Sequence, residues 1–267
     1  MKNIKVQCPA KINLSLKIKG KRPDGFHEIE SIMQTISLYD YLTIKIEKDT
    51  NNSIELSGNN SQIPYDNRNL VYKATELFFH TTKINNIKTK IYIEKNIPIS
   101  AGLAGGSTDA AGTLYGLNTI FNNPLLNEEL HKLCAQLGSD LNVCMQGGRL
   151  LAQGRGEIIT PLDFEEFNLS IIKPKNLGIS AKEAYTKFSL KNNNKLELSN
   201  RDNFVNDLEW AVIDDYEELK HIKTTYPEAI MTGSGSAYYI INGTFKDEPD
   251  YIIINNLKSI PHGIKLI

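Results

Sequence analysis

Hydrophobic and polar positions alternate strictly in the first part of the chain. Over residues 12–18 every second side chain is apolar, which is the period of a strand with one buried face. The same alternation at residues 42–46 and 91–93 predicts two more strands, and the Asn-rich stretch 49–60 is interpreted as a hairpin connection. The first half of the chain is therefore expected to open as a β-sheet.

Helical periodicity replaces this alternation further along the chain. Asn69 is a capping residue in front of residues 70–79, where apolar side chains recur at helical spacing. Residues 108–121 are rich in small and apolar side chains, and residues 127–137 begin with an acidic turn and stop at a glycine. These segments predict three helices, the first of which should cover the sheet.

A boundary between two lobes is expected in the middle of the chain. Predicted strands at residues 149–153 and 169–172 lie on either side of Pro161, in a stretch of turn residues. The interpretation divides the chain into an N-terminal lobe of residues 1–160 and a C-terminal lobe of residues 161–267.

The C-terminal lobe is predicted to mix helices with strands. Ser180 and Glu183 form a capping-box pattern that opens a short helix, and residues 204–224 present apolar side chains on one helical face. A further helix is predicted at residues 251–259, behind Pro249. The predicted strands of this part lie at residues 229–231, 237–241 and 263–267.

Length and charge limit the classes of function. With 267 residues the chain can form one large domain or two smaller ones, since single cores rarely exceed about 250 residues. Its formal net charge of -1 gives no long-range field for nucleic acid or an acidic membrane surface. We therefore expect neither as a partner, and any polyanion must be bound by local groups.

Cysteine usage and the N-terminal segment predict a cytoplasmic protein. Cys8, Cys134 and Cys144 form no CxxC pair and no even disulfide framework, so buried thiols in a reducing compartment are favoured. The first residues alternate charged with apolar side chains, unlike a signal peptide, and no stretch of about 18 apolar residues occurs.

A glycine-rich segment at residues 97–112, IPISAGLAGGSTDAAG, is the first candidate for chemistry. Its backbone N–H groups can converge on an anion at the start of a helix, as a triphosphate requires. Ser107 and Thr108 add hydroxyls that could meet a phosphate or its Mg²⁺. The segment lacks the Walker A and GxGxxG patterns, and taken alone it is more often a flexible loop before a small-residue helix.

Three segments together resemble a known family. PAKINLSL near the start, PISAGLAGGSTDAAG in the middle and MTGSGSAYYI near the end resemble, in this order, the three motifs of GHMP kinases, and the likeness covers nearly the whole chain. The resemblance implies a two-lobed α+β GHMP kinase fold, with a ribosomal protein S5 domain 2-like N-terminal lobe and a ferredoxin-like C-terminal lobe. It also implies that the active site lies between the lobes.

The resemblance implies two catalytic residues, Lys11 and Asp140. In isolation Lys11 would more often be a surface lysine on a strand, and Asp140 the first residue of a helix. The segment Gly-Ser-Asp-Leu-Asn-Val departs from the family's usual Gly-Ala-Asp-Val-Pro at Ser139, Leu141 and Asn142, but keeps the aspartate. The implied ATP-binding residues are Pro98, Ile99, Ser100, Ala101, Gly102, Leu103, Ala104, Gly105, Gly106, Ser107, Thr108 and Asp109.

GFHEIESIMQ, which begins at Gly25, resembles the segment that holds cytosine in the GHMP kinases of CDP-methylerythritol. The implied roles are stacking on the base for Phe26, where the family usually has tyrosine, and base-edge hydrogen bonds for His27. A second stacking aromatic is implied at Tyr185, with Phe188 as the competing candidate.

Further substrate-binding residues are implied by the first and third motifs. Asn13 shares a strand face with Lys11, because side chains two residues apart point the same way. It is a plausible hydrogen-bond partner for the substrate. The turn of the third motif adds Gly233, Ser234 and Gly235 as binding residues, although a plain hairpin turn would have the same sequence.

The reaction implied is transfer of the γ-phosphate of ATP, with Mg²⁺, to the 2-hydroxyl of CDP-methylerythritol in the non-mevalonate isoprenoid pathway. Asp140 would act as base and Lys11 would assist. The first alternative is a GHMP kinase for homoserine, mevalonate or a related alcohol, and the second is a non-catalytic nucleotide- or RNA-binding module. Metal ligands, oligomeric state and whether Asp140 acts as a base or mainly positions the hydroxyl are left open.

Overall fold

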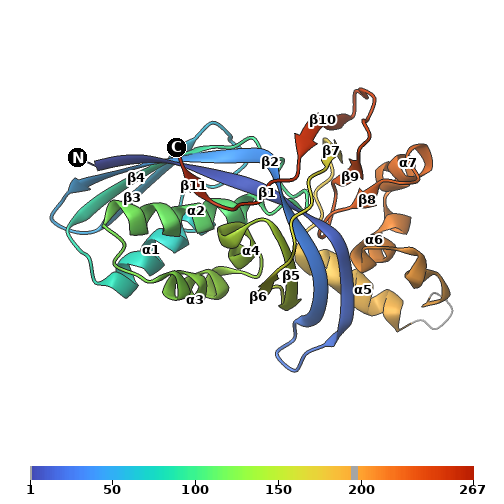
Figure 1. Ribbon diagram of the computed structural model, residues 1–267, viewed down its shortest axis with the longest axis horizontal. Helices are drawn as coiled ribbons and strands as arrows, with labels where there is room; N and C mark the ends of the chain where they lie inside the picture. Colours follow the sequence, from blue (N-terminus) through green and yellow to red (C-terminus); the bar gives the residue numbers. More distant parts are fainter. Residues whose placement is uncertain (1, 194–197) are drawn as a thin grey trace.

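The computed structural model describes residues 2–193 and 198–267, and it contains two β-sheets with helices packed against them (Figure 1). The first sheet has seven strands. Its main order is β11-β1-β2-β4-β3, and β5 pairs with both β2 and β6. Its strands are β1 (Lys2–Lys21), β2 (His27–Lys48), β3 (Ser53–Gly58), β4 (Ile87–Glu94), β5 (Arg149–Gly154), β6 (Ile158–Pro161) and β11 (Lys265–Leu266).

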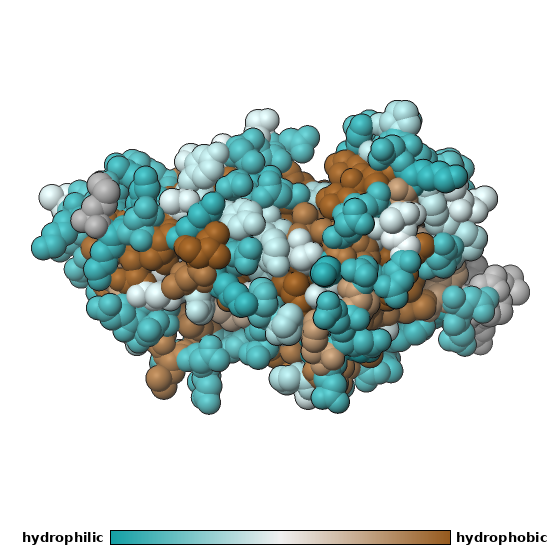
Figure 2. Space-filling model, turned by 45° about the horizontal axis from the view of Figure 1, so that its top comes forward, coloured by the Kyte–Doolittle hydropathy of each residue, from teal (hydrophilic) through white to brown (hydrophobic). Residues whose placement is uncertain are grey.

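The second sheet has four strands in the order β10-β7-β9-β8. Its edge strand β10 contains a run of half-buried isoleucines, and Figure 2 shows apolar side chains gathered over this sheet, with a second apolar area toward the left end of the molecule. The strands are β7 (Asn168–Pro174), β8 (Ile230–Met231), β9 (Tyr238–Ile241) and β10 (Tyr251–Lys258).

Four helices lie along one face of the first sheet: α1 (Leu70–Thr82), α2 (Gly105–Ile120), α3 (Asn127–Leu137) and α4 (Leu141–Gln146) (Figure 1). Three more lie at the other end of the molecule: α5 (Ala181–Asn192), α6 (Asp207–Val212) and α7 (Glu217–Thr225). Two 3₁₀ turns, Leu198–Asn203 and Ile213–Asp215, complete the described elements.

Helix α2 packs closely on the sheet because its facing residues are small. A Cβ on Gly112 would overlap the Cys8 sulfur, and one on Gly116 would lie 2.6 Å from the Ile44 Cδ1. Most of the helix is therefore buried between the sheet and its neighbouring helices, in one apolar core with α1 and α3. This packing fixes the position of the helix N-terminus.

The long hairpin of β1 and β2 joins the two ends of the molecule. Its first part belongs to the helix-covered sheet, whereas Leu16, Ile29 and Met33 pack in a second core with Phe188 and Trp210. Register shifts in the pairing with β2 occur at three places along β1, where the hairpin bends. One hairpin thus carries residues from the middle of the first sheet to the region beside α5 (Figure 1).

Most predicted strands and helices are confirmed. For helices α1 and α5, the residues that cap their N-termini explain why the prediction was possible. The Asn69 side chain accepts a hydrogen bond from the Val71 N–H at 2.9 Å and begins α1. Ser180 accepts in the same way from the Glu183 N–H at 3.1 Å and begins α5. Local side-chain hydrogen bonds of this kind can be predicted from a short stretch of sequence.

The prediction of a hairpin connection at residues 49–60 is wrong. The segment contains β3, which pairs with β4 in parallel, for example Leu56 with Ile91. A parallel pair needs a crossover, and α1 provides it. Ile54 and Leu56 alternate with polar residues as in a strand, but the many Asn, Ser and Gly residues around them favour a turn, and the short alternation is not recognised.

Two helix predictions in the second half are also wrong. Residues 251–259 form strand β10, in which Ile252, Ile253 and Ile254 pair with β7 and suit a pleated surface better than a helix. The single helix over residues 204–224 is instead two helices, because Tyr216 has an extended backbone (φ -133°, ψ 116°) and starts α7 anew.

We retain the division into lobes 1–160 and 161–267 as a proposal. The first six strands of the chain lie in the first sheet and β7 begins the second, but β11 returns to pair with β1, for example Leu266 with Val6.

Within residues 2–193 and 198–267, none of the helices is long and apolar enough to cross a membrane. Cys8, Cys134 and Cys144 are buried free thiols, as expected.

Candidate active site

A cavity of about 700 Å³ lies where the β1–β2 hairpin, the start of α2, the start of α4 and helix α5 come together. Both implied catalytic residues line it, and so do all the implied substrate-binding residues except Gly235. Those that line it are Lys11, Asn13, Phe26, His27, Asp140, Tyr185, Gly233 and Ser234.

Lys11 and Asp140 form an ion pair on the wall of this cavity. The Lys11 Nζ lies 3.5 Å from the Asp140 Oδ2, and the two side chains are 3% and 31% exposed. The ammonium also donates hydrogen bonds to the Asn13 Oδ1 at 2.7 Å and the Gly102 carbonyl at 3.0 Å. A buried cation is therefore held at a fixed point beside a carboxylate that lines the cavity.

The two members of the pair come from different elements. Lys11 lies in β1 opposite Thr35 of β2, and its N–H donates to the Leu103 carbonyl at 3.2 Å. Asp140 is the residue before α4, and its carbonyl accepts from the Cys144 N–H at 3.0 Å. Their pairing is a tertiary contact that neither local sequence determines.

Asn13 is buried, and its side chain is used within the protein. Its Oδ1 accepts from Lys11, its amide NH₂ donates to the Ser31 Oγ at 2.8 Å, and its backbone N–H donates to the Thr232 Oγ1 at 3.0 Å. These contacts favour a role in positioning the Lys11 ammonium. Its predicted contact with substrate remains a proposal.

Thr232 is a site residue that sequence reasoning missed. Its hydroxyl lies between Asn13 and the Gly102 carbonyl, at 3.3 Å from the Asn13 Oδ1 and 3.4 Å from the Gly102 oxygen. The residue thereby joins the third motif to both the first motif and the glycine-rich segment. The only available signal was its place directly before Gly233.

The glycine-rich segment forms a tight loop between two cavities. Its backbone has positive φ at Ser100, Gly102 and Ala104, and Gly102 passes so near Thr232 that a Cβ would overlap the Thr232 carbonyl oxygen. Ala104 and Ser107 line the 700 Å³ cavity, while residues 98–106 line a second cavity of about 340 Å³ on the other side.

The first turn of α2 is arranged to receive an anion. The helix begins at Gly105 directly after the loop, so the N–H groups of Gly105, Gly106 and Ser107 precede the first intrahelical hydrogen bond, which Thr108 donates to Ala104. These donors and the positive end of the helix dipole together favour phosphate. The nearby Thr108 side chain is itself fully buried.

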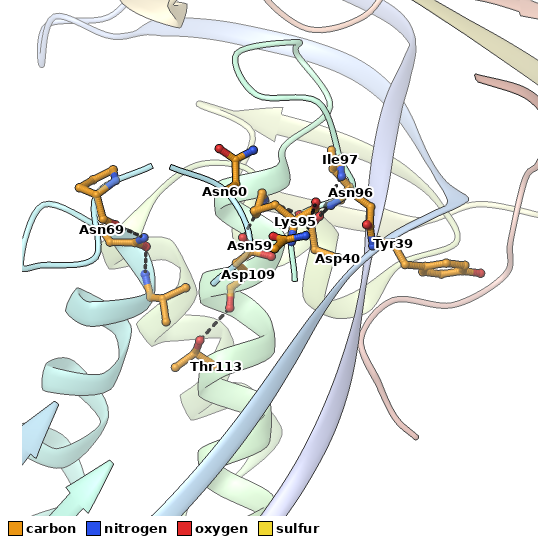
Figure 3. Close-up of polar contacts among 12 residues, drawn as sticks. Tyr39, Asp40, Asn59, Asn60, Asn69, Lys95, Asn96, Ile97, Asp109 and Thr113 are labelled. Atoms are coloured by element: carbon orange, nitrogen blue, oxygen red, sulfur yellow. Dashed lines mark hydrogen bonds and ion pairs between the residues drawn. The ribbon is translucent and has the colours of Figure 1, made fainter. Parts of the chain in front are cut away.

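A buried ionic cluster holds the two ends of the loop (Figure 3). Lys95, just before the loop, contacts the Asp40 carboxylate and lies 2.8 Å from the Asp109 Oδ2 in the first turns of α2. The Asp40 Oδ1 accepts from the backbone N–H groups of Asn96 at 2.6 Å and Ile97 at 2.8 Å. Strand β2, the loop and helix α2 are thus tied together by charge.

Asp109 is the member of this cluster whose pKa is raised by burial. Burial raises the pKa of its carboxyl to about 7, the Lys95 ammonium opposes the rise, and the Asp40 carboxylate adds to it. Among the described residues, its Oδ1 has no hydrogen-bond partner. Its carboxylate is committed to Lys95, so the structure favours a positioning role, and the predicted contact of Asp109 with ATP remains a proposal.

At the far end of the cavity, aromatic side chains from the hairpin tip and α5 come together. Phe26 is 51% exposed, with the Arg155 guanidinium carbon 4.9 Å from its ring centroid. The His27 ring stacks on Tyr185 with 5.0 Å between centroids and 17° between planes. Phe188 is buried against Trp210 and does not line the cavity, so Tyr185 is the better placed of the two candidates.

His27 is held as a neutral imidazole. Burial lowers its pKa below the usual 6.5, and the positive charge of Lys21 lowers it further. The Nε2 atom lies 3.0 Å from the Ser189 Oγ on α5. At neutral pH the ring therefore acts through hydrogen bonds rather than through charge.

The third-motif turn closes the cavity near Lys11. The Asn206 amide donates to the carbonyls of Met231 at 2.8 Å and Gly233 at 2.9 Å, and the Ser234 Oγ donates to the Ile179 carbonyl at 3.3 Å. Gly233 and Ser234 line the cavity, whereas Gly235 does not.

Cationic side chains on the cavity wall were also missed from the sequence. Lys21, Arg155 and Lys182 line the cavity, with Arg155 against the Phe26 ring and Lys21 paired with His27 in the hairpin, and cations of this kind bind phosphate groups. They come from the hairpin, the β5–β6 turn and α5, and no shared motif marks them.

In the described ranges 2–193 and 198–267, no cluster of three or more His, Cys, Asp or Glu side chains could hold a metal ion.

Comparison with known proteins identifies the family. Residues 69–148 match the GHMP kinases N terminal domain. The chain is 42% identical to the 4-diphosphocytidyl-2-C-methyl-D-erythritol kinase of Clostridium tetani. The alignment is 259 residues long and covers 88% of this chain and 90% of the relative. The chain belongs to the 4-diphosphocytidyl-2-C-methyl-D-erythritol kinase family. A Clostridium botulinum member of this family is 40% identical over 89% of each chain.

Solved structures agree with membership of this kinase family. A crystal structure of 4-(cytidine 5'-diphospho)-2C-methyl-D-erythritol kinase matches with a TM-score of 0.71 and 25% identity, over 88% of this chain and 89% of that one. Homoserine kinase from Cytophaga hutchinsonii matches with a TM-score of 0.70 at 15% identity, over 100% and 98% of the chains, and supports the fold alone. The predicted α+β GHMP kinase fold is confirmed, and the chain is a kinase of this family.

Proposed function

We propose that the chain transfers the γ-phosphate of ATP to the 2-hydroxyl of CDP-methylerythritol, with Asp140 and Lys11 as the catalytic residues. The observation that carries the proposal is the ion pair of 3.5 Å between these side chains, on the wall of a cavity that extends from the glycine-rich loop to the aromatic end. Phosphoryl transfer needs an oriented nucleophile and stabilised negative charge, and this pair supplies both.

In the proposed step Asp140 accepts the proton of the 2-hydroxyl. The hydroxyl oxygen forms a bond to the γ-phosphorus, the bond from that phosphorus to the bridging oxygen breaks, and ADP leaves. Lys11 stabilises the negative charge that develops on the transferred group. Because its ammonium is fixed by Asn13 and Gly102, it loses little freedom when the substrates bind.

ATP is proposed to lie along the glycine-rich loop. Its phosphates would accept hydrogen bonds from the N–H groups of the first turn of α2, and the cavity of about 340 Å³ beyond the loop offers room for the nucleoside. Arg68, Asn69 and Lys95 line that cavity.

ATP is proposed to bind with Mg²⁺, which supplies charge neutralisation on the phosphates. This ion is usually held by phosphate oxygens and water with few protein ligands. The Ser107 hydroxyl lines the cavity on the first turn of α2 and fits such a donor set, so Ser107 would hold the ion together with the phosphates.

The cytidine end is proposed to lie between Phe26 and Tyr185, with His27 at the edge of the base. An exposed phenylalanine is unfavourable in water, and stacking on a base would cover it. The diphosphate would then pass Lys21, Arg155 and Lys182 on its way to the catalytic pair.

The test is product analysis with three acceptors. ATP would be incubated with the protein and CDP-methylerythritol, mevalonate or homoserine, and products followed by ³¹P NMR. We expect ADP and one new phosphomonoester only with CDP-methylerythritol, with the phosphorus coupled to carbon 2. Faster turnover of mevalonate or homoserine, or a phosphate on another oxygen, would refute the proposal.

A further inference from the structure

Ser189 on α5 makes two hydrogen bonds through a single hydroxyl. Its Oγ donates to the Tyr185 carbonyl at 3.0 Å, one helical turn earlier, and lies 3.0 Å from the His27 Nε2. A hydroxyl has one proton, and a carbonyl can only accept. The bond to Tyr185 therefore uses the serine proton, and the contact with His27 requires the Nε2 atom to carry a proton and donate.

This arrangement fixes the proton of His27. Because burial and Lys21 keep the imidazole neutral, a proton on Nε2 leaves Nδ1 as a bare acceptor. Among the described residues, no group hydrogen-bonds to Nδ1. Stacking on Tyr185 and an edge contact with Phe188, at 5.9 Å between centroids, hold the ring in place.

We propose that Ser189 is a positioning residue for base recognition, which holds His27 in the Nε2-protonated form so that Nδ1 accepts from an exocyclic amino group. An amino group at that place donates a hydrogen bond, whereas a carbonyl there would put two acceptors together. Ser189 thereby makes the cavity prefer a cytosine base to a uracil base. This inference rests on the proposed placement of the base beside His27.

The sequence could not reveal this role. Ser189 is one of two hydroxyl residues on α5 that bond back to the preceding turn, and the other, Thr186, donates to the Lys182 carbonyl at 2.7 Å. Thr186 does not contact His27, so it provides a matched control on the same helix. Both residues line the cavity, but Thr186 is exposed, whereas Ser189 is half-buried and makes the contact with His27.

The test compares cytidine with uridine substrates. kcat/KM would be measured for CDP-methylerythritol and its uridine analogue with the unaltered protein and with Ser189→Ala, Ser189→Thr and Thr186→Ala. We expect Ser189→Ala to reduce the preference for cytidine about tenfold through KM, with kcat little changed. Ser189→Thr, which keeps the hydroxyl, and Thr186→Ala should retain the preference.

A second measurement reads the tautomer directly in the substrate-free protein. ¹⁵N NMR should show the His27 Nδ1 as an unprotonated ring nitrogen, and Ser189→Ala should shift the ring toward a mixture of tautomers. An unchanged base preference in Ser189→Ala, or a protonated Nδ1 in the unaltered protein, overturns the inference alone. No turnover of CDP-methylerythritol by the unaltered protein overturns the proposed function and this inference with it.

Discussion

Phe26 illustrates how one exposed side chain can report on ligand binding. It lies just before β2 at the hairpin tip, half exposed, with one cationic neighbour, Arg155. Its ring contributes little to the apolar cores, which are built from other residues. A change at this position should therefore affect binding more than folding.

Phe26→Ala is predicted to weaken binding of CDP-methylerythritol about tenfold or more, because stacking on a base contributes about 1–3 kcal/mol. Binding of ATP should change less than about twofold, since the glycine-rich loop lies at the other end of the cavity. Isothermal titration with each ligand measures both effects. The control is Phe164→Ala, an exposed phenylalanine outside the cavity, and equal losses for both ligands would refute the placement.

At the scale of elements, the Lys95 cluster explains how a glycine-rich loop can keep one shape. Asp40 binds the backbone at the start of the loop, and Asp109 lies in the helix at its end. Lys95 joins the two carboxylates in a buried setting, where unpaired charge is costly. The cluster therefore stabilises both the fold and the phosphate-binding turn.

Lys95→Met should lower the free energy of unfolding by about 3–5 kcal/mol, because it leaves two buried carboxylates without a counter-ion. Urea denaturation measures the change. Lys90→Met, in β4 shortly before Lys95, is the matched control, since the Lys90 pair with Glu47 is partly exposed and should contribute less than about 1 kcal/mol. Similar losses in the two variants would contradict the role of the cluster.

Elements with local signals could be predicted from the sequence, and elements set by distant partners could not. Asn69 and Ser180 cap their helices through bonds within three residues. Residues 251–258 instead form a strand because they pair with β7, far away in the chain. The extended backbone of Tyr216, which divides the expected long helix, likewise had no marker in the apolar pattern.

At the scale of the whole molecule, the site includes a close approach of backbone between the two halves of the chain. Gly102 of the loop packs against the backbone of Thr232, which lies between strands of the second sheet, and Lys11 reaches the Gly102 carbonyl. Any side chain at Gly102 would push the loop and the third-motif turn apart. The catalytic geometry therefore relies on this contact.

Gly102→Ala is predicted to lower the free energy of unfolding by about 2–4 kcal/mol, since the new Cβ overlaps backbone and φ is 74°. Turnover should fall even where the variant is folded. The added Cβ displaces the loop, and the carbonyl of residue 102 then moves away from the Lys11 ammonium that donates to it. The control is Gly20→Ala, where a Cβ meets nothing within 4 Å. Urea denaturation checks the prediction, and equal stability of the two variants would contradict it.

The site could be predicted in its motif residues but not in the contacts that hold them. Family resemblance indicated Lys11 and Asp140, and the structure brings them together. Thr232 and Ser189 carry no motif of their own, because their roles come from tertiary hydrogen bonds. Such partners become visible only when the fold is known.

The most direct test of the account is Asp140→Asn, with kcat and ATP affinity measured on the same preparation. The amide fills the same space but cannot take the proton of the substrate hydroxyl. We predict a loss of kcat of about 100-fold or more, with the dissociation constant for ATP unchanged within about threefold. Near-normal turnover in Asp140→Asn would contradict the assignment of Asp140 as the catalytic base.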